Sequence, residues 1–174
     1  MFFQIKIATL HCGKNIMAIK KLPIGIQSFS KMIESGFVYL DKTELIYKLA
    51  NTEACYFLSR PRRFGKSLTL STLHEYFNGR KDLFVGTKME QLEQKWDKYP
   101  VLHFDFNASS YKTVDDVMSR ISFMLSEYED EYGRNPNAST NSERFQSLIT
   151  TIAKKTGKKV VILVDEYDKP LLNN

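Results

Sequence analysis

Residues 60–67, with the sequence RPRRFGKS, constrain the fold of this chain more than any other segment. The preceding residues 54–58 are almost wholly apolar, as is typical of a strand buried on both faces of a sheet. After the segment, apolar residues recur at helical spacing up to Phe77, and Gly79 can end the helix. The sequence therefore predicts a strand, a tight turn and a helix, in that order.

The predicted turn carries the residue types that hold a phosphate. The first turn of a helix presents free N–H groups and a partial positive charge, so Lys66 is unfavourable there without a bound anion. With a phosphate bound, the backbone would cradle it, Lys66 would reach its outer oxygens and Ser67 would ligate Mg²⁺. Arg60 stands where the pattern GxxxxGK[ST] has a glycine, and Pro61 fixes the backbone after it. A basic turn without a ligand is therefore the alternative on spacing alone.

A second apolar run, residues 160–164, predicts an interior strand of a parallel sheet and ends in Asp165-Glu166. Carboxylates at the carboxyl end of such a strand lie where phosphate turns also lie. Asp165 would then bind Mg²⁺ together with Ser67, and Glu166 would position and polarise an attacking water. The alternative is an acidic pair that ends a strand and caps the next helix. The two half-motifs together favour nucleotide binding.

Four segments resemble the bacterial AAA-ATPase-like family. They are residues 21–29 (KLPIGIQSF), 38–43 (VYLDKT), 56–67 (YFLSRPRRFGKS) and 165–172 (DEYDKPLL). The resemblance runs from about Met17 to the last residue, and an arginine at position 60 is ordinary in this family. It implies a P-loop NTPase domain that uses ATP and Mg²⁺, commonly followed in longer members by a nuclease-like domain of the PD-(D/E)XK type.

This resemblance and the motif spacing define the predicted site. Glu166 and Lys66 are the predicted catalytic residues, and Ser67 and Asp165 the predicted metal ligands. The residues predicted to contact the nucleotide are Arg60, Pro61, Arg62, Arg63, Phe64, Gly65, Lys66, Ser67 and Leu68.

Length and composition fit one α/β domain, because 174 residues with 43% apolar content can bury a single core. We expect a P-loop three-layer sandwich with a mainly parallel sheet. We expect that sheet to be incomplete at its C-terminal side, since the sequence ends soon after Glu166. Residues 1–16 fall outside the resemblance and are treated as an extension, whereas residues 17–174 form the NTPase domain.

The remaining pattern predicts how the two motifs are connected. Residues 101–106 predict a second strand, and residues 113–132 and 140–157 predict helices, the latter opened by a capping box at Thr140. Asp105, near the end of the second strand, is expected to cap the following turn, with a contribution to the metal site as the alternative. Residues 23–50 either cover the nucleotide base or simply pack on the edge of the sheet.

The charge is unevenly distributed. Net charge is +5, and residues 1–88 contain 14 Lys and Arg but 6 Asp and Glu. The arginines of the turn either stabilise a triphosphate or face a nucleic acid or an acidic partner, and nucleic-acid binding is supported by charge alone.

Two cysteines without metal-ligand spacing favour a reducing, cytoplasmic location, and the apolar N-terminal stretch is too short to span a membrane.

The sequence thus predicts Mg²⁺-dependent ATP binding and, in a complete protein, hydrolysis to ADP and phosphate. For this chain alone we expect weak binding and poor hydrolysis. The alternative is a nucleotide-binding switch or interaction module that does not turn over, coupled to a nucleic-acid-processing domain outside this sequence. The sequence does not indicate an oligomeric state.

Overall fold

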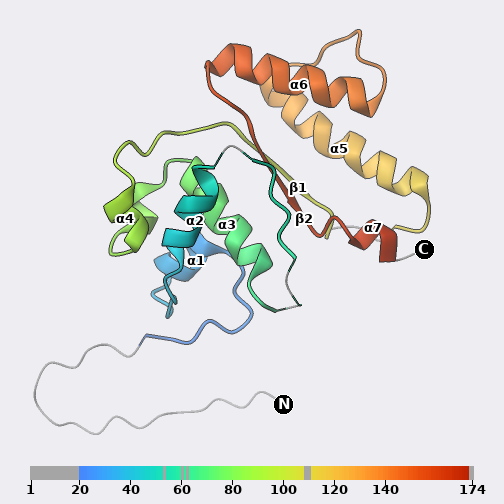
Figure 1. The fold of residues 1–174 in the computed structure, drawn as a ribbon. Coiled ribbons are helices and arrows are strands. Elements are labelled where there is room, and N and C mark those ends of the chain that lie inside the picture. The colour runs from blue at the N-terminus through green and yellow to red at the C-terminus, as the bar shows by residue number, and fades with distance from the viewer. Residues whose placement is uncertain (1–19, 53, 60, 62, 108–110, 173–174) are drawn as a thin grey trace, which may run out of the picture.

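The computed structural model describes residues 20–172, except residues 53, 60, 62 and 108–110 (Figure 1). The predicted extension at residues 1–16, Arg60 and Arg62 therefore lie outside the described residues. The first half of the chain contains α1 (Phe29–Glu34), α2 (Thr43–Ala50), α3 (Lys66–Phe77), the 3-10 helix η1 (Lys81–Phe84) and α4 (Lys88–Leu92). The second half contains β1 (Val101–Asp105), α5 (Val114–Tyr132), α6 (Asn141–Thr156), β2 (Val161–Asp165) and α7 (Lys169–Leu172).

β1 and β2 form a parallel pair in register, from Val101 opposite Val161 to Asp105 opposite Asp165. Both strands lie where the strands at residues 101–106 and 160–164 were predicted. The connection between them is a crossover through α5 and α6, as parallel pairing requires. Mixed helices and a parallel strand pair are compatible with the predicted α/β class. Within the described residues the named sheet has two strands, so the predicted three-layer sandwich is not shown.

The strand pair lies between two groups of helices (Figure 1). Leu102 and Phe104 of β1 pack with apolar residues of α5 and α6. Leu163 of β2 joins the other cluster, which contains residues of α1, α2, α3, η1 and α4. Because side chains alternate between the two faces of a strand, one face meets α3 and the other meets the α5–α6 hairpin.

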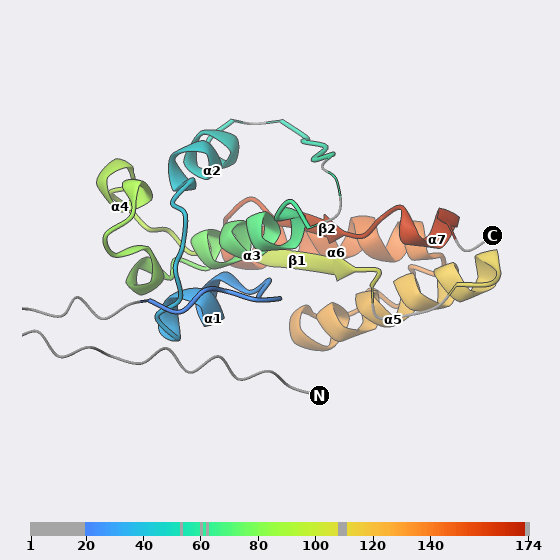
Figure 2. The same ribbon diagram turned by 90° about the horizontal axis from the view of Figure 1, so that it is seen from below.

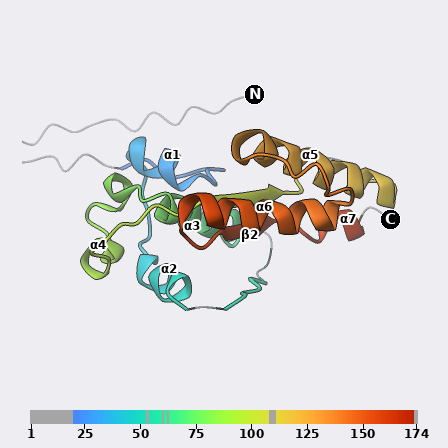
Figure 3. The ribbon, with the colours of Figure 1, turned by 90° about the horizontal axis from the view of Figure 1, so that it is seen from above.

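α5 and α6 lie side by side (Figures 1 and 3). Each begins with a complete capping box, at Thr113 with Asp116 and at Thr140 with Glu143. Arg144 of α6 and Glu129 of α5 form a buried ion pair of 2.7 Å between Nη2 and Oε2. The pair joins the acidic end of α5 to the first turns of α6.

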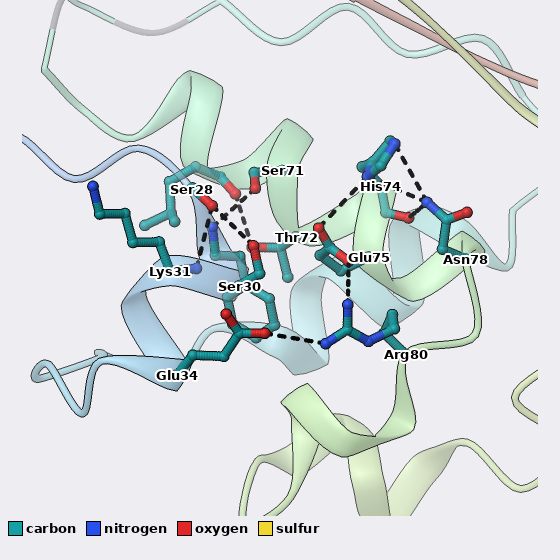
Figure 4. A network of polar contacts seen from close by, with 12 residues as sticks. Ser28, Ser30, Lys31, Glu34, Ser71, Thr72, His74, Glu75, Asn78 and Arg80 are labelled. Carbon is teal, nitrogen blue, oxygen red and sulfur yellow. Dashed lines mark hydrogen bonds and ion pairs between the residues drawn. The ribbon is translucent and has the colours of Figure 1, made fainter.

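α3 is fastened to α1 by polar contacts (Figure 4). The backbone N–H of Phe29 donates to Ser71 Oγ at 2.9 Å, and Arg80 Nη2 lies 3.1 Å from Glu34 Oε1. Phe29 itself is fully buried and its ring meets those of Tyr39 and Phe84. These contacts pack Phe29 into the core and join α1 to α3, and whether residues 23–50 also cover a nucleotide base stays a prediction.

The predicted buried strand at residues 54–58 is wrong for the described structure. Tyr56 is 51% exposed and Phe57 69% exposed, and the segment has no strand conformation. A strand buried on both faces needs hydrogen-bonded neighbours, and the two named strands pair only with each other in the part of the chain described. Residues 54–58 are apolar, but among the residues described no strand pairs with them.

One edge of β2 is open in the described structure. Val161 N donates to Pro100 O at 2.9 Å, and Phe106 N donates to Asp165 O at 3.2 Å, so these alternate residues of β2 face β1. The backbone groups of Ile162 and Val164 consequently face the opposite edge. Their side chains are 41% and 40% exposed.

Candidate functional site

The N-terminus of α3 contains the predicted phosphate turn. α3 begins at Lys66, and Gly65 is its N-cap residue with a φ of 78°. Thr69 N donates to Gly65 O at 2.9 Å, which closes the first turn of the helix. A Cβ on Gly65 would meet nothing within 4 Å, so glycine is needed for its left-handed backbone rather than for space.

The first turn of α3 differs from those of α1, α5 and α6. Those helices each have a side-chain oxygen that accepts from the first turn, supplied by Ser28, Thr113 and Thr140. α3 has no side-chain cap and no acidic residue in its first turn. Its N-terminal N–H groups therefore present a partial positive charge without a side-chain acceptor.

Two residues just before α3 have a positive φ. Arg63 has a φ of 69°, which is uncommon for a residue other than glycine, and Gly65 again has a positive φ. Phe64 N, between them, donates to Pro61 O at 3.3 Å. The N–H of Phe64 is therefore already used within the turn, and the N–H groups left for a phosphate are those of the first turn of α3.

The other residues of the predicted turn differ in exposure. Pro61, Arg63 and Phe64 are exposed, whereas Lys66 and Ser67 are half-buried. Leu68 packs against the core cluster that contains Phe29 and Leu163. Leu68 therefore has only its backbone available for a ligand.

The acidic half of the predicted site lies at the carboxyl end of β2. Asp165 Oδ1 accepts from Glu166 N at 3.0 Å, and Glu166 has a φ of 53°. Lys169 N donates to Glu166 O at 3.0 Å as α7 begins. Asp105, opposite Asp165, accepts from Asn107 N at 2.7 Å, which agrees with the predicted capping role.

The two halves lie at the same end of the sheet. α3 begins near the end at which β1 and β2 finish (Figures 1 and 2). Asp165 is in register with Asp105 and two residues after Leu163, so its side chain lies on the α3 face. Within the described residues no hydrogen bond or ion pair joins Lys66 or Ser67 to Asp165. The donors available for a metal, a hydroxyl and a carboxylate, are the hard oxygen ligands that Mg²⁺ prefers.

Two side-chain contacts were not predicted from the sequence. The ring of His103, on β1, lies 6.0 Å from that of His74 on α3. Burial and His74 lower the pKa of His103, against the opposing effect of Asp105 and Asp165, which favours a neutral ring. The rings of Phe57 and Tyr167 also meet, with centroids 5.0 Å apart. Neither pair has a sequence spacing that would reveal it.

Comparison with known proteins identifies the family. Residues 23–174 match the family described as "Predicted AAA-ATPase". The chain is 43% identical over 162 residues to the "Uncharacterized protein in vnfD 5'region" of Azotobacter chroococcum mcd 1. That alignment covers 91% of this chain and 31% of the relative, so the chain spans about a third of the relative's length. No solved structure matches.

Membership of an ATPase-like family indicates nucleotide binding. The chain belongs to the predicted AAA-ATPase family, which confirms the resemblance found in the four sequence segments. No helix among the described residues is long and apolar enough to cross a membrane.

Proposed function

We propose that residues 17–174 form one NTPase domain that binds ATP with Mg²⁺ and, in the full-length protein, hydrolyses it. The observation that carries the proposal is the first turn of α3. It combines a lysine, a left-handed glycine and the absence of a side-chain cap with a position at the acidic end of the sheet. A bound phosphate would supply the missing acceptor.

Each residue of the site has a distinct role in this proposal. The N–H groups of residues 65–68 hold the phosphates, and the Lys66 ammonium offsets charge on the γ-phosphate. Ser67 and Asp165 hold Mg²⁺, which when bound neutralises charge on the phosphate oxygens. Glu166 orients the attacking water and accepts its proton. Catalysis then depends mainly on alignment and fixed charge.

The arginines of the turn complete the electrostatic part of the site. Arg60, Arg62 and Arg63 surround the phosphates with positive charge in this proposal. A reducing, cytoplasmic location is part of the proposal, because the two cysteines of the sequence lack metal-ligand spacing. The process to which nucleotide binding is coupled belongs to the full-length protein. The family resemblance implies that this process is carried out by a nucleic-acid-processing domain.

A non-hydrolysing interaction module is the second candidate. The open edge of β2 and the exposed apolar segment 54–58 favour it, because unpaired strand edges bind other polypeptide segments. The two candidates differ in turnover but agree on nucleotide binding.

Titration with a fluorescent ATP analogue and a phosphate-release assay test the proposal. Lys66→Ala should lose binding, whereas Glu166→Gln should retain binding and abolish phosphate release. Lys154→Ala on α6 removes a positive charge away from the turn and serves as the control. If Lys66→Ala binds as tightly as the wild type, the phosphate role is wrong. If Glu166→Gln turns over at the wild-type rate, the water-orienting role is wrong.

A further inference from the structure

Two exposed aromatic side chains meet at the end of the sheet that contains the candidate site. The rings of Phe57 and Tyr167 have centroids 5.0 Å apart and planes at 62°, an edge-to-face arrangement. Phe57 is 69% exposed and Tyr167 44% exposed, and neither belongs to the two core clusters. Core packing therefore does not explain the contact.

The contact connects the two halves of the candidate site. Phe57 lies in the segment that leads into the phosphate turn, and Tyr167 directly follows Glu166. In the part of the chain described, β2 pairs with β1 alone, so no strand ladder joins residues 54–58 to β2. The ring contact is thus a direct link between the entry to the turn and the acidic end of β2.

Tyr167 also adjoins a constrained backbone. Glu166 has a φ of 53°, and its N–H and carbonyl are held by Asp165 Oδ1 and Lys169 N. A residue other than glycine stays in this conformation only when its surroundings hold it there. Because Tyr167 is bonded directly to Glu166, a contact that holds its ring acts on the residue next to this constrained backbone.

We propose that Phe57 and Tyr167 are positioning residues that set the phosphate turn against the acidic strand end. They act through Asp165 and Glu166 and do not touch the nucleotide. This inference rests on the proposed function, because its effect is exerted on a metal bound between Ser67 and Asp165. Its specific consequence is that Phe57, although remote in sequence from Asp165, controls how much Mg²⁺ strengthens ATP binding.

The test measures ATP affinity with Mg²⁺ and with a chelator in the wild type, Phe57→Ala, Tyr167→Ala and the double variant. Mg²⁺ increases ATP affinity by a certain factor in the wild type, and each single change should reduce this factor about threefold to tenfold. This is the range expected for loss of an aromatic pair. Affinity without Mg²⁺ should change little, because the turn and Lys66 remain. The double variant should match the single variants, since both changes remove one contact.

Three controls separate positioning from general damage. Phe57→Tyr and Tyr167→Phe keep the ring contact and should keep the wild-type effect of Mg²⁺. Tyr56→Ala removes a neighbouring aromatic side chain that is 51% exposed. This change should also leave the effect of Mg²⁺ on ATP affinity unchanged. Circular dichroism checks that every variant is folded.

The outcomes distinguish the inference from the function on which it rests. A wild-type chain that binds no ATP overturns both. If the wild type binds ATP, and Mg²⁺ increases the ATP affinity of folded Phe57→Ala as much as that of the wild type, only the positioning role is overturned. Additive losses in the double variant overturn it as well, because they would mean that the two rings act separately.

Discussion

Replacing Arg144 by methionine should destabilise the hairpin that connects β1 to β2. Glu129 Oε2 lies 2.7 Å from Arg144 Nη2, Glu129 Oε1 lies 2.9 Å from Arg144 Nε, and both side chains are 5% exposed. Removing one partner of a buried pair costs about 3–5 kcal/mol, because a buried charge loses its counter-ion. Arg134 Nε is 3.9 Å from Glu129 Oε2 and compensates in part, so we expect about 3 kcal/mol.

Thermal and urea unfolding followed by circular dichroism measure this loss. For a domain of this size about 3 kcal/mol corresponds to a lower Tm of about 6–12 °C. The variant with both Arg144→Met and Glu129→Leu should recover most of the loss, because no charge remains buried. A single variant within about 0.5 kcal/mol of the wild type, or a double variant less stable than the single one, would refute the reasoning.

The same pair predicts a pH dependence. The hydrogen bond from Arg144 lowers the pKa of Glu129, so the stabilisation is complete above the usual glutamate pKa of about 4.3. It is lost as the pH falls through the lowered value, because Glu129 is then protonated in the folded state. The difference in unfolding free energy between wild type and Arg144→Met should therefore shrink on acidification. A constant difference down to pH 2 would contradict this cause.

Two further predictions concern the turn and the open strand edge. Gly65→Ala and Gly86→Ala should each cost about 1 kcal/mol in urea unfolding, because both positions have a positive φ and space for a Cβ. Only Gly65→Ala should weaken ATP binding, and equal affinities would remove the turn from the site. In hydrogen exchange measured by NMR, the amides of Ile162 and Val164 should exchange faster than that of Leu163, which faces β1. Equal protection of the three amides would show that the edge of β2 is covered.

The sequence predicted those helices and strands that are marked by a local capping motif or by a regular pattern of apolar residues. β2 was located by a continuous apolar run and β1 by the strand pattern of residues 101–106, and the start of α6 was located by the capping box at Thr140. The segment 54–58 has equally strong strand composition but lacks strand neighbours in the described structure. Strand formation depends on a hydrogen-bonded partner, and composition contains no information on whether one is available.

The same distinction applies to the candidate site. Gly65-Lys66-Ser67 and Asp165-Glu166 are contiguous motifs, so their positions on a helix start and a strand end could be predicted. The meeting of Phe57 with Tyr167 joins residues 110 positions apart in the sequence and follows only from the way the chain folds. The ion pair of Glu129 with Arg144 was likewise not predicted, since α5 and α6 had first to be placed side by side.

A crystal structure of the chain with Mg²⁺ and a non-hydrolysable ATP analogue tests the central claim most directly. We expect phosphate oxygens within hydrogen-bonding distance of the backbone N–H groups of residues 65–68, and Mg²⁺ held by Ser67 and Asp165. A nucleotide bound elsewhere, or a metal that contacts neither Ser67 nor Asp165, would contradict it.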